Sequence, residues 1–599
     1  MRPEKRPPSE ELDVTRRPGK SGAEKALKGK PAAGPADAGV EPEAGSVPQE
    51  KQLGEDGAEA AGAEKASRSK SRRGENGKRP APQGAAQAMA ARQREISISE
   101  FFTKNRHLLG FDNPRRALMA TVKEAVDNSL DACEEARILP AISVEIRQIN
   151  ENRFRVIVTD NGPGIVRAQI PKIFGKLLYG SKFHTLKQSR GQQGIGISAA
   201  GMYGQITTGK PIVIASRTRT RPGRPAHYYE IQIDTQKNEP IVLKDAEVEW
   251  QGEGTGTLVE VELEGQYQKG RHSVDAYLQQ TAMANPHVEI RYLPPKGDPV
   301  HLPRVVEELP PDPREIKPHP YGVELGVLKG LLKAAKGQRV AGFFTHTFSR
   351  VSAATARDIC LRAGLKPEAK CHLLRPEEVE KLYEATAATR LMAPPTDCLS
   401  PIGEELILKS LKQQVQAEFF TARTRRPSVY RGNPFLVEVG IAHGGDLAAD
   451  DLMSLHRFAN RVPLLFQQSA CAITDAVLSI DWRAYGLSQS RGALPVGPAV
   501  MLVHLASVWV PFTSESKEAV ADYDAIVKEI RLALQDCGRQ LGLHVRRRKK
   551  EAEAARKRSY IEKYIPYIGE ALQEILSLSQ ARRGKLEQQL SDLLERSRA

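Results

Sequence analysis

The stretch Glu124-Ala-Val-Asp-Asn-Ser-Leu-Asp-Ala132 decides the fold of this chain. Glu124 and Asn128 are four residues apart, so on a helix they share one face and reach one site. Apolar residues between and beyond them are typical of a helix that packs into a core. A carboxylate can orient or deprotonate water, and a carboxamide oxygen can ligate Mg²⁺. The stretch therefore indicates a helix facing a metal-bound phosphate, although the pair alone also fits a solvated helix face.

Two glycine-rich segments follow this helix. Asp160-Asn-Gly-Pro-Gly164 comes directly after a strand-like run at 154–159. Such a turn lets a flat base approach the backbone, and its carboxylate can accept a hydrogen bond from an exocyclic amine. Gly191-Gln-Gln-Gly-Ile-Gly196 precedes an expected helix at 197–203 and offers backbone N–H groups to phosphates. A G-x-x-G-x-G pattern alone more often marks a turn, and the chain has neither a Walker lysine pattern nor a Rossmann strand directly before these glycines.

In this order the three segments resemble the N-box, G1 and G2 motifs of the GHKL ATPases. A fourth element fits the same family, since Gly254-Thr-Gly-Thr257 precedes a strand expected at 258–262. The resemblance implies a Bergerat α/β sandwich that binds ATP and Mg²⁺.

Residue roles follow from the resemblance, motif by motif. It implies that Glu124 polarises the attacking water, and that Asn128 ligates Mg²⁺ carried by the ATP phosphates. Asp160 and Thr257 are expected to bind adenine. The remaining nucleotide-binding residues implied by the motifs are Gly162, Gly164, Ser181, Lys182, Gly191, Gln192, Gln193, Gly194, Ile195, Gly196, Ile197 and Ser198.

Beyond residue 395 the resemblance narrows. Segments 426–440, 457–466 and 510–517 are similar to the transducer domain of the topoisomerase VI B subunit family. The match implies that Lys517 reaches the γ-phosphate and takes part in both ATP binding and catalysis. Strands at 435–442 and 499–510 and a helix at 523–542 are expected here.

The composition is that of a DNA-associated protein without a membrane segment. The 599 residues carry a net charge of +15, which favours an anionic partner such as double-stranded DNA. The six cysteines form no C-x-x-C pair, and no apolar run approaches the ~20 residues of a membrane span. We therefore expect a cytoplasmic, nucleoid-associated protein, although basic clusters near the N-terminus leave a nuclear location open.

Changes in composition divide the chain into five parts. Residues 1–95 contain no aromatic residue, which predicts a disordered basic tail, and Pro-rich stretches mark two later boundaries. We expect an α+β multidomain chain with a tail at 1–95, a GHKL ATPase domain with an N-terminal strap at 96–310, an all-α helix-two-turn-helix domain at 311–393, an α/β transducer domain at 394–545, and a basic helical segment at 546–599. The strap could instead be a helix on its own domain, and the all-α unit a spacer rather than a DNA-binding module.

The resemblance implies the ATPase subunit of a type IIB DNA topoisomerase. ATP would dimerise two such subunits and close a gate around one duplex, while a partner A subunit, contacted by the C-terminal segment, cuts a second duplex within an A2B2 heterotetramer. Two alternatives stay open at this point. One is another GHKL gate of the MutL or gyrase type, and the other is a scaffold in which ATP is only a structural ligand.

Overall fold

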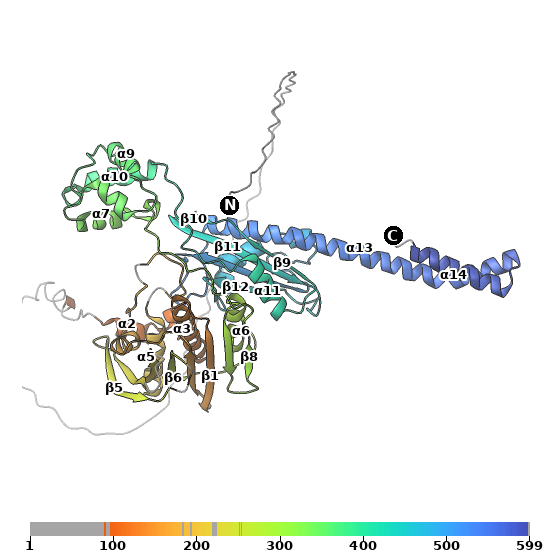
Figure 1. Ribbon diagram of the computed structural model, residues 1–599, viewed down its shortest axis with the longest axis horizontal. Helices are drawn as coiled ribbons and strands as arrows, with labels where there is room; N and C mark the ends of the chain where they lie inside the picture. The colour runs from red at the N-terminus through yellow and green to blue at the C-terminus, as the bar shows by residue number, and fades with distance from the viewer. Residues whose placement is uncertain are drawn as a thin grey trace, which may run out of the picture. The chain divides into compact units, whose positions relative to one another are not determined.

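The computed structural model describes residues 89–90, 96–182, 185–191, 194–218, 225–250, 252 and 254–596. The tail predicted at 1–95 lies outside the described residues, apart from 89–90. Within the described part of the chain, no helix is long and apolar enough to cross a membrane. The fold class is α+β, as predicted, with two separate sheets and a long C-terminal helix (Figure 1).

The first sheet has eight strands in the order β5-β4-β3-β6-β2-β1-β7-β8. Its strands are β1 (Ala141–Asn150), β2 (Arg153–Asp160), β3 (Ile212–Arg217), β4 (Ala226–Asp234), β5 (Glu239–Val248), β6 (Gly256–Glu264), β7 (Glu289–Leu293) and β8 (Val300–Leu302). Strand β2 alternates buried and half-buried residues, because helices cover one face of the sheet. The β2–β6 register places Asp160 opposite Thr257, so the two predicted base-binding residues meet at one strand end.

Helices α2 (Ile98–Lys104), α3 (Pro114–Glu135), α4 (Ile170–Gly175), α5 (Gly196–Thr208) and α6 (Val274–Ala284) accompany this sheet. Helix α3 begins cleanly, since Asn113 accepts a hydrogen bond from the Arg116 N–H and Pro114 occupies the first turn. Its buried residues Val122, Val126 and Leu130 join the sheet in one core. Helix α2 packs on its own domain, where Phe102 belongs to that core.

A small helical unit follows. It contains α7 (Leu325–Ala334), α8 (Val340–Thr347), α9 (Ala353–Arg362) and α10 (Pro376–Ala388). Phe343, Phe344, Ile359 and Leu382 lie in its own hydrophobic core. Helical patterns in the sequence at 325–335, 352–363 and 376–388 predict three of these helices, whereas α8 was missed because it has only eight residues.

The second sheet is built around two long, buried strands. Its elements are α11 (Glu404–Gln414), β9 (Phe419–Thr424), β10 (Ser428–Tyr430), β11 (Asn433–His443), β12 (Ser454–Ala459), β13 (Val462–Pro463), α12 (Ala472–Leu478) and β14 (Ala499–Ser507). The strand order is β10-β11-β14-β12-β13, and β9 also pairs with β11. All nine residues of β14 are buried, because helices pack on both faces.

The chain ends in α13 (Asp524–Leu576) and α14 (Gln580–Arg596), and α14 runs back along the end of α13 (Figure 1). The expected helix end at Gly542 is wrong, since α13 runs on to Leu576 and has 53 residues in all. Gly538 serves close packing instead, because a Cβ there would lie 2.7 Å from the Tyr485 ring. No residue from Val545 to Tyr564 is buried.

Candidate functional site

A cavity of about 600 Å³ lies over the first sheet, between α3 and the start of α5. This volume is within the usual range for small-molecule sites. Of the predicted site residues that the structure describes, all except Gly162 line the cavity. Gln192 and Gln193 lie outside the described residues.

One end of the cavity is organised around the buried carboxylate of Asp160. Its Oδ1 accepts hydrogen bonds from the Gly162 N–H (2.9 Å) and the Thr257 N–H (3.1 Å). Its Oδ2 accepts one from the Ser129 hydroxyl (2.8 Å). Burial raises the pKa of Asp160 above its ordinary value, while these three donors oppose that shift. Gly162 thus supports the site through Asp160 rather than by lining the cavity.

Two hydroxyl groups at this end were not singled out by sequence reasoning. Ser129 lies one residue after Asn128 on α3, so its spacing from Glu124 gave no signal. The Ser216 hydroxyl on β3 lies 3.2 Å from that of Thr257 and accepts from the Ile165 N–H (2.7 Å). Together they fix the Asp160 carboxylate and the Thr257 side chain beside the cavity.

Glu124 lies on the opposite side, against the start of α5. A Cβ on Gly196 would collide with the Glu124 carboxylate, so only glycine fits there. Lys123 Nζ lies 3.0 Å from Glu124 Oε1. Burial favours protonation of Glu124, but the ammonium groups of Lys123 and Lys517 outweigh it and lower its pKa. Glu124 is therefore an ionised carboxylate facing the cavity; Lys123, which supports it, was missed in the sequence.

Asn128 lines the cavity one helical turn after Glu124, and its side chain is exposed. Among the described residues, no cluster of three or more His, Cys, Asp or Glu side chains could hold a metal ion by itself. A divalent cation here would therefore need ligands from a bound molecule in addition to an amide oxygen such as that of Asn128.

The loop from Gly191 to Ser198 leads into α5, a helix of 13 residues. Among the residues that the structure describes, no side chain at the N-cap position bonds to its first N–H groups, which leaves them available to an anion. Ile195 and Ile197 contribute side chains to the core. The Ser198 hydroxyl donates to the Ile173 carbonyl (2.8 Å), so the helix start is tied to α4 and Ser198 has only its backbone N–H to offer.

Two lysines approach the cavity and both are engaged with the protein. Lys182 Nζ lies 2.6 Å from Asp131 Oδ2 on α3. Lys517, from the second sheet's domain, has φ 55° and donates to the Arg190 carbonyl (3.0 Å). Burial lowers the pKa of Lys517, although Glu124 opposes that shift. The structure thus places Lys517 and Glu124 in the lining of one cavity, despite 393 positions between them in sequence (517 − 124).

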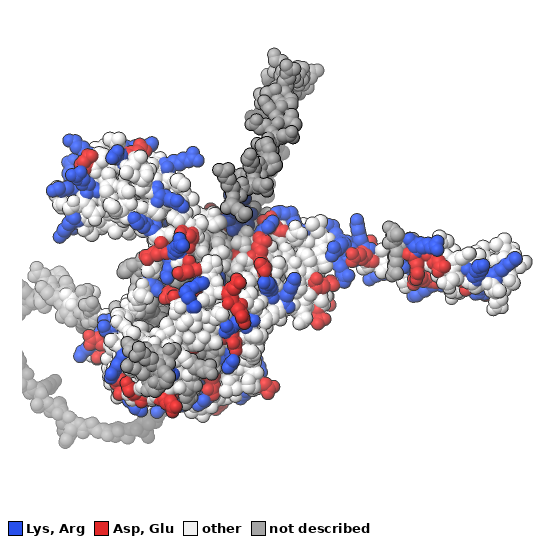
Figure 2. Space-filling view, in the orientation of Figure 1, with Lys and Arg blue, Asp and Glu red and all other residues white. Residues whose placement is uncertain are grey.

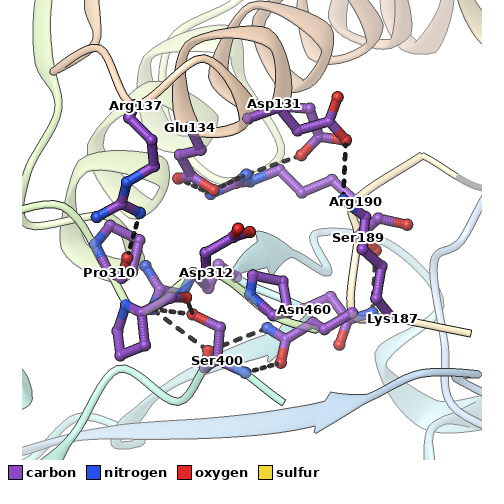
Figure 3. Close-up of a pocket in the computed structure, with 15 residues that line it drawn as sticks. Asp131, Glu134, Arg137, Lys187, Ser189, Arg190, Pro310, Asp312, Ser400 and Asn460 are labelled. Atoms are coloured by element: carbon purple, nitrogen blue, oxygen red, sulfur yellow. Dashed lines mark hydrogen bonds and ion pairs between the residues drawn. The ribbon is translucent and has the colours of Figure 1, made fainter. Parts of the chain in front are cut away.

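A smaller pocket of about 40 Å³ is lined in part by Arg190, whose carbonyl accepts the hydrogen bond from Lys517 (Figure 3). Figure 3 shows the Arg190 side chain reaching Asp131 and Glu134 on α3, at 2.8 and 2.6 Å. The guanidinium and His287 hold the pKa of Glu134 well below its ordinary value, against the effect of burial. The pocket brings residues of both sheets' domains and of the connecting chain together.

Positive charge gathers outside the cavity on two surfaces. Figure 2 shows Lys and Arg side chains over the helical unit of α7, α9 and α10. Its exposed basic residues are Lys333, Lys336, Arg339, Arg350, Arg357, Arg362, Lys366, Lys370, Arg375, Lys381 and Arg390. The second surface is the run 546–550 on α13, where Arg548 also pairs with Glu418 (2.9 Å). Both surfaces can face an anionic polymer.

The domains built around the two sheets each match a known protein family. Residues 113–263 match the model of histidine kinase-, DNA gyrase B- and HSP90-like ATPases, and residues 394–557 match that of the topoisomerase VI B subunit transducer. The B subunit of type 2 DNA topoisomerase 6 from Methanosarcina barkeri is 49% identical over 82% of this chain and 79% of that protein. The corresponding proteins of Archaeoglobus fulgidus and Pyrococcus horikoshii are 47% and 40% identical, over 82% and 80% of this chain and 80% and 91% of those proteins.

Proposed function

The chain belongs to the topoisomerase VI B subunit family, and from this premise we propose that its cavity hydrolyses Mg²⁺-bound ATP to drive passage of one DNA duplex through another. As a family member the chain is the ATPase subunit of a type II DNA topoisomerase. The family excludes the MutL and gyrase alternatives. The observation that carries the proposal is the convergence of Asp160, Glu124, Asn128 and Lys517 on one cavity of nucleotide size.

The base end suits adenine. Asp160 has three donors fixing its oxygens, and a carboxylate has about four acceptor positions, so one remains for an exocyclic amine. Gly164 has φ 71° and its Cβ would collide with the Arg217 carbonyl, so glycine keeps the backbone close to a flat ring. Thr257 lines the same wall.

The phosphate end suits a triphosphate. The uncapped start of α5 and the ammonium of Lys517 attract negative charge, and Gly191 and Gly194 let the backbone approach. Lys182 would exchange its ion pair with Asp131 for a phosphate. Mg²⁺, when bound, would neutralise phosphate charge, and the Asn128 amide oxygen would hold it. The Glu124 carboxylate then orients the attacking water and accepts its proton.

Membership of a B subunit family implies a partner A subunit. We propose an A2B2 heterotetramer in which ATP dimerises two copies of this chain, with residues 546–599 contacting the A subunit. The functional division would be 96–310 for ATP hydrolysis, 311–393 for DNA contact and 394–545 for the transducer. The reaction would take place on chromosomal DNA, in the cytoplasm or a nucleus.

Steady-state ATP hydrolysis, measured with and without DNA and the A subunit, tests the proposal. An active subunit hydrolyses ATP and, with the A subunit, relaxes supercoiled DNA only when ATP is present. A chain that binds ATP without turnover under all conditions would be a scaffold, which contradicts the proposal.

DNA contact has its own test in the salt dependence of affinity. Replacing Arg546 and Lys550, two exposed residues of the run 546–550, with alanine should reduce the slope of log K against log salt by about 2, because each phosphate contact releases roughly one counterion. Arg548→Ala is the matched control: its charge is already paired with Glu418, so we expect a smaller change. Equal slopes for all variants would place the DNA elsewhere.

A further inference from the structure

The three residues Gln188, Ser189 and Arg190, directly before the phosphate loop, form the junction segment. Each bonds to a different part of the chain: Gln188 to Ser400, Ser189 to Asn460, and Arg190 to α3. Figure 3 labels the last two of the three residues. Gln188 and Arg190 are 7% and 6% exposed, so water cannot easily replace these bonds. The segment is therefore fixed by specific protein contacts on several sides.

Arg190 joins the segment to the catalytic helix and to Lys517. Its guanidinium pairs with Asp131 and Glu134 on α3, while its carbonyl accepts the hydrogen bond from Lys517 Nζ. The Lys517 contact thus reaches α3 through one residue. A contact between Lys517 and the phosphate end of the cavity is already expected from the transducer motif, so this connection is not the new one.

Gln188 makes a second connection, to the chain that enters the transducer domain. Its N–H donates to the Cys398 carbonyl (3.0 Å). Its carboxamide nitrogen donates to the Ser400 carbonyl (3.1 Å), and its oxygen accepts from the Ser400 N–H (2.7 Å). A single side chain therefore uses both its donor and its acceptor on one backbone residue.

The residues after Ser400 are in turn bound to the second sheet. Glu438, at the centre of β11, accepts from the Ile402 N–H (2.8 Å) and the Gly403 N–H (2.7 Å). Arg461 donates to the Pro401 carbonyl (2.9 Å). Hydrogen bonds therefore connect Gln188 to Ser400, and the residues just after Ser400 to Glu438 on β11, a central strand of the transducer sheet.

Asn460 supports the same junction from the end of β12. Its carboxamide nitrogen donates to the Ser189 carbonyl (3.0 Å) and to the Ser507 carbonyl (2.9 Å). Its oxygen accepts from the Ser507 N–H (2.9 Å) at the end of β14. The junction segment is thus attached to the sheet at two points, neither of which involves Lys517.

We propose that Gln188 is a positioning residue that couples the phosphate loop to the transducer by a route independent of Lys517. The inference rests on the proposed function. Gln188 lies three residues before Gly191, so a shift of the loop when the γ-phosphate leaves must move or strain the Ser400 bonds. Gln188 is not among the described residues that line the cavity, so its role is to transmit and not to bind nucleotide.

The test compares two glutamines with the same bonding. Gln205 also donates to and accepts from a single backbone residue, Ile233 (3.1 and 2.8 Å), but within the ATPase domain. Gln188→Met and Gln205→Met remove the same pair of bonds at similar side-chain volume. Each full-length variant is assembled with the A subunit, and ATP hydrolysis and supercoil relaxation are measured in the same reaction.

We expect Gln188→Met to hydrolyse ATP within about twofold of wild type but to relax about tenfold less DNA per ATP; Gln205→Met should keep the wild-type ratio. Asn460→Asp keeps the acceptor for the Ser507 N–H but loses the donor to the Ser189 and Ser507 carbonyls, and it should lower the ratio in the same direction. If thermal melting shows that Gln188→Met does not fold, Asn460→Asp replaces it as the test variant.

A wild-type ratio in both Gln188→Met and Asn460→Asp overturns the inference. So does a parallel loss of hydrolysis and relaxation, because a merely structural contact would lower both together. Failure of the wild-type chain itself to relax DNA with the A subunit and ATP would instead remove the proposed function.

Discussion

The two ends of the cavity are built differently. At the base end, the Asp160 oxygens are fixed by Ser129, Gly162 and Thr257, all within the first sheet's domain. At the phosphate end, Lys182 and Lys517 bond to Asp131 and to the Arg190 carbonyl. The base end is thus organised before any ligand arrives, whereas the phosphate end must exchange protein contacts for ligand contacts. Such an exchange lets one end hold the nucleotide while the other responds to its hydrolysis.

The largest expected effect separates chemistry from binding at the phosphate end. Glu124→Gln removes the carboxylate that orients water, so turnover should fall by about 100-fold or more while ATP affinity stays near wild type. Steady-state kinetics measures the turnover, and equilibrium binding measures the affinity for ATP. Glu145→Gln, on β1 outside the cavity, is the control. Near-normal turnover in Glu124→Gln would remove Glu124 from the reaction.

The next effect lies at the base end and should concern binding alone. Asp160→Asn replaces a charged acceptor with an amide that also donates, so ATP and ADP should both bind about 10- to 100-fold more weakly. Calorimetry with each nucleotide measures this. Asp234→Asn is the matched control, since Asp234 also accepts from two backbone N–H groups but lies at the end of β4, before the turn to β5. Unequal losses for ATP and ADP would contradict a pure base contact.

A smaller effect should distinguish ATP from ADP at the phosphate end. Lys517→Ala loses a charged contact that we expect only with the γ-phosphate, so turnover should fall about tenfold while the Kd for ADP changes less than about twofold. Lys517→Arg should rescue poorly, because a planar fork does not replace a compact ammonium. Lys528→Ala on α13 is the control. A wild-type rate of DNA relaxation in Lys517→Ala would reduce this lysine to a structural contact.

The smallest effect tests whether the base end is fixed in advance. Ser129→Ala removes one neutral donor to Asp160, worth about 1 kcal/mol, so ATP and ADP should each bind about fivefold more weakly at unchanged kcat. Ser99→Ala is the control: Ser99 is also buried and donates to a side chain, Asn238 (3.2 Å), away from the cavity. A change in kcat would show that the two ends are not separable.

Sequence reasoning reached the residues whose chemistry is tied to local spacing. Glu124 and Asn128 share a helix face, and Asp160 follows a strand directly, so their positions could be predicted. Ser129, Ser216 and Lys123 could not, because a serine or lysine in a helix or strand carries no signal until the fold supplies its partner. Gln188 and Ser400 are 212 positions apart, and only the fold brings their bonds together.

The expected helix end at Gly542 shows a different limit. Glycine commonly ends helices because it lowers helix propensity and adopts a left-handed conformation. In α13 Gly538 instead admits the Tyr485 ring, and Gly542 lies beside the same residue at ordinary contact distance. Tyr485 is 53 and 57 positions away from the two glycines in sequence (538 − 485 and 542 − 485). The low helix propensity of glycine is offset here by tertiary packing against Tyr485. Such a long-range contact cannot be read from a single sequence.

The length of α13 has a mechanical consequence. Residues 546–565, which precede Pro566 within the helix, extend about 30 Å at 1.5 Å per residue, so a tilt of about 5° at the sheet would carry the end of this part roughly 2.6 Å. A stiff rod of this kind works as a lever: it multiplies displacement and divides force by the same ratio. Whatever is bound at its tip must therefore move with little resistance, and a firmly anchored load would bend the rod instead of following it.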